Sequence, residues 1–359
     1  MMNKNETIAK AIDAMKICNA CRYCESYCAV FDAMELKSSF SESDIYYLAN
    51  LCHDCRGCYY SCQYAPPHEF DLNIPKTFSK IRAVTYHKFS WPPNFSLASF
   101  KYGGLLILLS VLSITGVLWG LFSGGKFFFS DHPDNSFYSV IPEAVIIWIS
   151  AALFLFVIIS FVKSFVSFRS FIGHNSHLRL KPVLKAFADV LTLRYLDGFG
   201  EGCNYEDESF SNWRRWMHQM ILYGFVLTFA ATTAAAIYEH LLHIKPPYSY
   251  FSLPVILGTS GGVLQIAGII GMFWLKLKSD KAPYYEHLIG FEISFSLLLF
   301  FVSFSGFLVL IFRETAAAQF MFIVHIGLVW TLFLYLPYSK FTHAVYRFAA
   351  LLYFHKSQR

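Results

Sequence analysis

"ICNACRYCESYC" (Ile17–Cys28) and "LCHDCRGCYYSC" (Leu51–Cys62) are two copies of one cysteine motif. Each copy has the spacing C-x2-C-x2-C-x3-C, and the cysteines of the second copy all follow their counterparts at one constant distance, as 52 follows 18. Eight of the nine cysteines of the chain lie in these two segments. Such tight clustering is typical of metal binding, whereas the cysteines of a disulfide framework are spread along a chain.

The spacing within the motif has a chemical reason. Three thiolates separated by two residues each can bind three corners of one iron–sulfur cubane, and the fourth reaches the neighbouring cluster in two-cluster ferredoxins. The sequence therefore predicts two [4Fe–4S] clusters, the first bound by Cys18, Cys21, Cys24 and Cys62 and the second by Cys52, Cys55, Cys58 and Cys28. Zinc is the alternative that any cysteine set allows. Cys203 is left over, and we expect it to be a small buried or turn residue.

Two features set these motifs apart from bacterial ferredoxins. The bacterial run ends in Cys-Pro, but Ala29 and Gln63 follow the fourth cysteines here. The two motifs are also far enough apart for a helix around Glu42–Leu51, which indicates the helical ferredoxin variety of respiratory iron–sulfur subunits. Arg22 and Arg56 occupy matching places in the motifs. They could raise the cluster potentials or bind an acidic partner, and solvated charge is the simpler interpretation.

The rest of the chain has the composition of a membrane protein. Of its 359 residues 55% are hydrophobic and 15% are charged, against about 25% charged in soluble domains. After Trp91–Phe95 the sequence contains six apolar stretches, each long enough to cross ~30 Å of hydrocarbon with about 20 residues. They are Tyr102–Phe122, Ala144–Phe165, Met217–His240, Pro254–Leu275, Leu288–Phe312 and Ala318–Leu336. The rival count is four spans with two buried helices.

The predicted fold is therefore mainly α-helical, with two parts. Residues 1–90 form an α-helical ferredoxin domain with two [4Fe–4S] clusters, and residues 91–359 form a six-helix membrane bundle with a long loop at 167–212. Within that loop, "KPVLKAFADVLTLRYL" (Lys181–Leu196) has apolar residues at roughly helical spacing. An amphipathic helix there could lie on the membrane or against the cysteine domain, or be a surface helix without function.

Basic residues predict the orientation in the membrane. Cytoplasmic loops are enriched in Lys and Arg, and one set of connections holds most of them, whereas the opposite set holds little more than Lys126, Lys245 and Arg313. The N-terminus, the cysteine domain and the C-terminus all fall on the basic side, so we expect them in the cytoplasm. A net charge of +5 with no basic stripe argues against nucleic acid as a partner. The basic set is Arg169, Arg179, Lys181, Lys185, Arg194, Arg214, Arg215, Lys276, Lys278, Lys281, Lys340, Arg347, Lys356 and Arg359.

Four histidines are candidate haem ligands, because ionisable residues in spans are rare and usually functional. At 1.5 Å per residue, His218 and His343 fall near the cytoplasmic surface, and His240 and His325 fall in the outer half. Two helices that each offer a histidine at one level can bind b-type haem through both imidazoles. The alternative is hydrogen bonding to water or lipid headgroups.

Two other features of the spans have two possible uses each. Glu292 could relay a proton to a quinone or lie near the interface without a role. The glycines of Gly258–Gly271 could admit a macrocycle or pack helix on helix.

The order of these parts resembles the tricarballylate utilisation protein B family over nearly the whole chain. The resemblance is carried by the two cysteine motifs, the six spans and four segments: "LTLRYLDGFGEGCNYEDESFSNWRRWMHQMILYGF" (191–225), "SLPVILGTSGG" (252–262), "FRETAAA" (312–318) and "LPYSKFTHAVYRFAAL" (336–351). It implies [4Fe–4S] clusters on the eight cysteines and b-type haem, one or two, on His218, His240, His325 and His343.

The resemblance also implies a function. A member of this family would be a bacterial inner-membrane subunit that reoxidises the reduced flavin of an FAD-containing dehydrogenase and passes the electrons to the quinone pool. It would have no substrate chemistry of its own. The rivals are a subunit of another respiratory iron–sulfur oxidoreductase, such as a heterodisulfide-reductase-like enzyme, and a haem-free membrane anchor with a docking ferredoxin domain.

Overall fold

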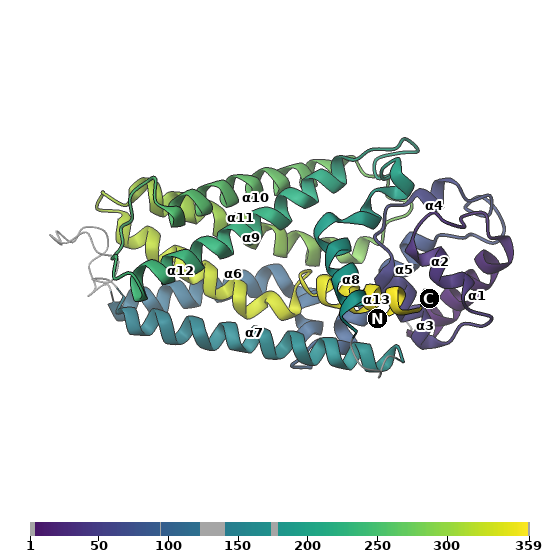
Figure 1. The fold of residues 1–359 in the computed structure, drawn as a ribbon, viewed down its shortest axis with the longest axis horizontal. Coiled ribbons are helices and arrows are strands. Elements are labelled where there is room, and N and C mark those ends of the chain that lie inside the picture. The colour runs from purple at the N-terminus through teal and green to yellow at the C-terminus, as the bar shows by residue number, and fades with distance from the viewer. Residues whose placement is uncertain (1–3, 94, 123–140, 174–178, 358–359) are drawn as a thin grey trace.

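The computed structural model describes residues 4–93, 95–122, 141–173 and 179–357. In these ranges the chain is helical, and the pairing of Cys203 with Ser211 is an isolated β-bridge. The N-terminal part contains five helices: α1 (Lys4–Cys21), α2 (Ala29–Glu35), α3 (Glu42–Leu51), α4 (Gly57–Tyr60) and α5 (Ile74–Phe89). They lie together at one end of the molecule, the right-hand end of Figure 1.

Six longer helices form a bundle beside this N-terminal part and run along the long axis of the molecule (Figure 1). All six are long and apolar enough to cross a membrane, which confirms the six predicted helices. Their bounds are α6 (Phe95–Phe122), α7 (Glu143–Phe171), α9 (Trp213–His240), α10 (Leu253–Lys278), α11 (Ile289–Phe312) and α12 (Ala318–Tyr335). Lys126, one of the residues used to predict the orientation, lies outside the described residues.

Glycines set the closest contact in the bundle, between α9 and α10. A Cβ built on Gly224 would lie 2.7 Å from the backbone nitrogen of Gln265 and from the carbonyl oxygen of Gly261. A Cβ on Gly262 would lie 2.8 Å from the ring of Phe307 on α11. Real Cβ atoms do not approach other atoms so closely, so only glycine fits at these positions. Of the two uses open for these glycines, packing of helix on helix is the one observed.

The cysteine-containing part has an apolar core that the C-terminal helix completes. In α3, the hydroxyl of Ser41 and the carboxylate of Asp44 form a capping box at the N-terminus of the helix. The C-terminal helix α13 (Thr342–Ser357) buries Tyr346 and Leu351 in the same core as Tyr46 and Phe78 of the N-terminal part. The end of the chain thus holds the cysteine-containing part against the bundle.

The loop between α7 and α9 contains an amphipathic helix, α8 (Leu180–Thr192), which packs against α13. Its Asp189 carboxylate lies 2.5 Å from Nε2 of His355, and both side chains are buried. In Figure 1, α8 lies across the direction of the bundle helices, between the bundle and the N-terminal part. Short 3₁₀ turns complete the fold at Arg194–Leu196, Gly198–Gly200, Glu286–Leu288 and Leu336–Tyr338.

Glu292 belongs to a cluster of charged residues that joins three segments of the bundle. Its carboxylate lies 2.6 Å from the ammonium nitrogens of both Lys276, at the end of α10, and Lys340, ahead of α13. The hydroxyl of Tyr284 donates to the same carboxylate at 3.0 Å. Glu292 therefore forms a bridge with two lysines, a role that was not among the two considered from sequence.

Candidate metal centres

The two cysteine motifs share one backbone feature, although their secondary structure differs. Cys18 and Cys21 lie in the last turns of α1 and the rest of the first loop follows it, whereas the second loop, with Cys52 and Cys55, begins after α3. Arg22 has a φ of 55° and Arg56 has a φ of 68°, so the equivalent residues of the two loops adopt the same left-handed conformation. This conformation is uncommon for residues other than glycine and recurs at functional sites. The sequence repeat is thus matched in structure at this arginine, but not throughout, since Asp54 has a φ of 59° and its counterpart Ala20 is helical.

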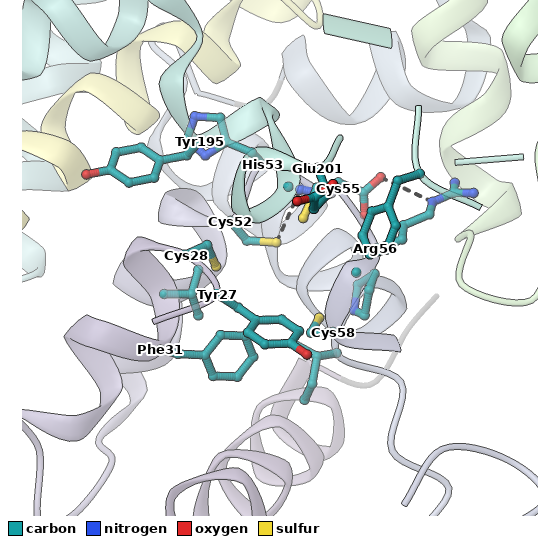
Figure 2. Close-up of a pocket in the computed structure, with 17 residues that line it drawn as sticks. Tyr27, Cys28, Phe31, Cys52, His53, Cys55, Arg56, Cys58, Tyr195 and Glu201 are labelled. Carbon is teal, nitrogen blue, oxygen red and sulfur yellow. Dashed lines mark hydrogen bonds and ion pairs between the residues drawn. The ribbon is translucent and has the colours of Figure 1, made fainter. Parts of the chain in front are cut away.

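Each loop contributes to two cavities. One cavity is lined by Cys18, Cys21, Cys24 and Cys62, and also by Cys58, which lines both cavities. The other is lined by Cys28, Cys52, Cys55 and Cys58, and Figure 2 shows these four cysteines around it. The fourth cysteine of each motif has crossed to the cavity of the other motif. These groups are the two sets that the spacing assigns to separate clusters.

The spacing of the sulfur atoms fits a cluster better than a single zinc ion. Four thiolates on one zinc ion, each at about 2.3 Å, lie about 3.8 Å from one another. Among the described residues, the one group of three or more ligand atoms that all lie within 4.8 Å of one another comprises Glu143, Glu239 and His240. The cysteine sulfurs are spread more widely, as ligands to different corners of a cubane must be.

The chemistry of these thiols also favours a bound cationic centre. Burial, and after it the charge of nearby cysteines, raises the pKa of Cys18, Cys24 and Cys28 to about 12. Without a metal, these thiols would stay protonated at neutral pH. A bound metal centre lowers the pKa of its thiol ligands and keeps them as thiolates, so it would offset the effect of burial. Two further bonds to sulfur, from the backbone nitrogen of Asp54 to Cys52 at 3.4 Å and from the Gln63 amide to Cys21 at 3.6 Å, suit the ligands of a cluster.

The two cavities differ in their surroundings. Beside the first, the ring of Tyr23 is 63% exposed. The loop of the second is held by arginines from other segments: Arg82 of α5 donates to the carbonyl of Ala49 at 3.2 Å, and Arg347 of α13 donates to the carbonyl of Cys52 at 2.8 Å. Arg214 of α9 donates to the carbonyl of Asp54. The second site is thus bound directly to α9 of the bundle and to α13.

Arg56 is a further tie between the second loop and the bundle. Its guanidinium donates to the carbonyls of Tyr205 and Asp280, at 3.1 and 3.0 Å, and lies over the Tyr205 ring at 4.2 Å. Arg56 is 1% exposed. The interpretation of solvated charge is therefore wrong for Arg56, whereas Arg22, its counterpart in the first motif, is exposed.

We expect Arg56→Gln to lower the free energy of unfolding by about 3 kcal/mol, because two carbonyls lose a charged donor and a buried contact is broken. The measurement is the midpoint of thermal unfolding of the purified protein in detergent. Arg22→Gln is the matched control, and we expect it to change stability by no more than about 0.5 kcal/mol. Equal effects of the two substitutions would contradict the assigned role of Arg56.

His218 and His343 come together at the end of the bundle nearest the cysteines. Their ring centres lie 6.0 Å apart, with an angle of 76° between the ring planes. Nδ1 of His343 donates to the carbonyl of Lys340 at 2.5 Å, which leaves Nε2 available as a ligand. Burial lowers the pKa of His343 well below its ordinary value, so the imidazole is neutral. Nδ1 of His218 is buried and has no hydrogen-bond partner among the described groups.

The other two candidate ligands have different neighbours. Nδ1 of His325 lies 2.9 Å from the hydroxyl of Ser305 on α11. Nδ1 of His240 lies 3.7 Å from the carboxylate of Glu143 on α7. The structure therefore joins one of the two expected histidine pairs directly and places His240 and His325 beside other helices.

Sequence reasoning missed Arg82 and His53 and assigned Arg214 and Arg347 to membrane orientation alone. His53 is 7% exposed, and its Nδ1 lies 2.9 Å from the carbonyl of Leu51. The one available signal was its place next to Cys52, inside the second motif. Cys203 agrees with expectation, because it is fully buried and lies in the turn bridged to Ser211.

Comparisons with known proteins cover both parts of the chain. A family model described as Citrate utilization protein B matches residues 99–359, and one described as Citrate utilization protein B Fer4-like domain matches residues 11–88. A curated relative from Escherichia coli, "Citrate utilization protein B", is 38% identical over 350 residues, which are 97% of this chain and 92% of the relative. No solved structure matches.

Proposed function

We propose a function from one premise: the chain belongs to the citrate utilization protein B family. This assignment confirms the resemblance found in the sequence, and a Fer4-like domain in such a chain fits an iron–sulfur electron-transfer subunit. We propose, more specifically, that the protein reoxidises the reduced flavin of a partner FAD-containing dehydrogenase. The electrons would then pass through two [4Fe–4S] clusters and b-type haem to the quinone of a bacterial inner membrane.

The observation that carries this proposal is a continuous set of contacts from the second cysteine loop to the histidine pair. Arg347 donates to the carbonyl of Cys52, and it lies one helical turn after His343 on the same face of α13. The ring of His343 in turn contacts that of His218. A protein that moves electrons from a cluster into a membrane needs such a path, whereas a mere anchor does not.

The spacing of His218 and His343 supports haem as the group between them. Two imidazoles that bind one metal ion from opposite sides, at roughly 2 Å each, have their ring centres about 6 Å apart. The observed 6.0 Å agrees with this value. The hydrogen bond from Nδ1 of His343 to a backbone carbonyl is the usual support of a ligating histidine. When bound there, haem would supply a one-electron carrier inside the bundle.

The arrangement also supports a direction of transfer. The first cavity lies beside the exposed ring of Tyr23, so a flavoprotein would meet that cluster first. The second cavity is bound to α9 and α13, so it would pass electrons onward. A two-electron flavin would be reoxidised in two one-electron steps. The excess of basic residues at this end of the bundle supports a cytoplasmic location for the cysteine domain and both termini.

Reduced-minus-oxidised spectra of the protein in membranes test the proposal. We expect b-type haem bands that appear when quinol is added, because haem in contact with the quinone pool must equilibrate with it. A flavoprotein should also co-purify with the protein. If the protein shows neither haem bands nor quinol-linked reduction of its clusters, the electron-transfer function is wrong, and a haem-free anchor with a docking domain is the better description.

A further inference from the structure

Helix α8 has three distinct faces. One face packs on the core formed by α13 and the cysteine-containing part, through Ala186 and Asp189. A second face carries Leu180, Leu184 and Phe187, spaced four and three residues apart and therefore on one side of the helix. These three side chains are 72%, 59% and 55% exposed. The packed face explains why α8 is helical and buried on one side, but it leaves the apolar stripe of Leu180, Leu184 and Phe187 uncovered.

Hydrogen bonds fix the height of α8 relative to the bundle. Its C-terminal carbonyls accept from three side chains of α9: Arg215 and Gln219 both donate to Thr192, at 3.0 and 3.2 Å, and Tyr223 donates to Leu191 at 2.9 Å. These donors belong to the first three turns of α9. The end of α8 therefore lies beside a helix that is apolar enough to cross a membrane, and not out in the cysteine-containing part.

The neighbouring residues at this end of the bundle have the character of a membrane interface. Trp213 and Trp216, at the start of α9, are each 63% exposed. Trp274, at the end of α10, is 59% exposed, and Lys278 lies over its ring at 4.6 Å. Exposed tryptophans beside lysines are typical of the level of lipid headgroups. The C-terminal end of α8 lies beside the same first turns of α9.

We propose that α8 is a membrane-surface helix whose apolar stripe lies in the lipid interface and thereby holds the cysteine-containing part against the bilayer. The chemistry of its third face fits this partner: Lys181 is exposed beside the stripe, so its ammonium group can reach anionic headgroups while Leu180, Leu184 and Phe187 enter the acyl boundary. Lys185, one turn further on, lines a cavity together with Asp32 and Asp197. Figure 1 shows α8 across the bundle direction, which is the direction of the bilayer plane if the six helices span it. This inference rests on the proposed membrane placement of those helices.

Site-specific photo-crosslinking tests the inference. The photoreactive residue p-benzoylphenylalanine replaces Phe187 in the full-length protein, which is then irradiated in vesicles of phosphatidylethanolamine and phosphatidylglycerol. We expect phospholipid adducts in mass spectra of the α8 peptide. Phe70 is the matched control, because its ring is 52% exposed but lies in the cysteine-containing part. At least tenfold more lipid adduct at Phe187 than at Phe70 is the expected result.

A positive control separates this inference from the membrane proposal. Phe304 is 43% exposed on α11, and the same probe there should give lipid adducts if the bundle spans the bilayer. Adducts at Phe304 but none at Phe187 or at Leu184 would overturn the inference about α8 alone. Adducts from position 187 to a second protein or to a second copy of the chain would overturn it as well. No adducts at Phe304 would overturn the membrane placement, and the inference with it.

Discussion

Replacing His343 with alanine should lower the haem content of the purified protein to half or less while both iron–sulfur clusters remain. The imidazole of His343 is held by Lys340 and faces His218 with a ring-centre distance of 6.0 Å. Under the proposed function, His218 and His343 would hold the haem, so alanine would remove one of the two imidazoles, and a haem held by one imidazole would be released far more readily. The haem content would fall to half, and not to zero, if the bundle also holds a second haem that His343 does not bind. Haem is measured as the pyridine complex, and iron and acid-labile sulfide are measured on the same sample.

His287→Ala is the control for this substitution. His287 is exposed, and its ring centre lies 5.2 Å from that of Tyr285, with the two rings tilted by 57°. Its replacement should leave haem content unchanged. If His343→Ala keeps its full haem content, as the control does, and His325→Ala loses its haem, the residues that hold the haem lie deeper in the bundle. The contact path through α13 would then not lead to haem, and the proposed order of electron carriers would be wrong.

The comparison of sequence and structure shows which features follow from local spacing. The six helices that are apolar and long enough to cross a membrane, and the grouping of cysteines into two cavities, depend on runs of residues that are close in the chain. The depth of a histidine along a helix is equally local, because each residue adds 1.5 Å. For this reason His218 and His343 were expected at one level, and they do meet.

Features that depend on which segments become neighbours were not predictable from one sequence. The depth of His240 and His325 along their helices gave no information about their partners. Helix packing places Glu143 of α7 beside His240 and Ser305 of α11 beside His325. Arg347 is separated from Cys52 by 295 positions, yet the two are hydrogen-bonded. Arg56 lies in a motif whose equivalent arginine is exposed, so only tertiary contacts distinguish the two. The position of α13 in the core of the cysteine-containing part has the same origin.

The crossed assignment of the fourth cysteines gives the second large prediction. Cys28→Ser should remove the cluster of the second cavity and retain that of the first, although Cys28 belongs to the first motif. Cys62→Ser should do the reverse, because Cys62 lines the first cavity. Each variant should contain about 4 non-haem iron atoms per chain, against about 8 in the unchanged protein. Iron analysis and electron paramagnetic resonance of the reduced protein measure the result.

The two variants should also differ in electron transfer, and this difference tests the proposed direction. Cys62→Ser keeps the cluster beside the Arg347–His343 contact, so a small chemical reductant should still reduce haem at nearly the normal rate. Cys28→Ser lacks that cluster, so haem reduction should slow at least tenfold. Cys203→Ser is the control, because this buried thiol donates to the Leu196 carbonyl at 3.2 Å and lines neither cavity. Equal rates in the two cluster variants would mean that the second cavity is not the exit toward the membrane.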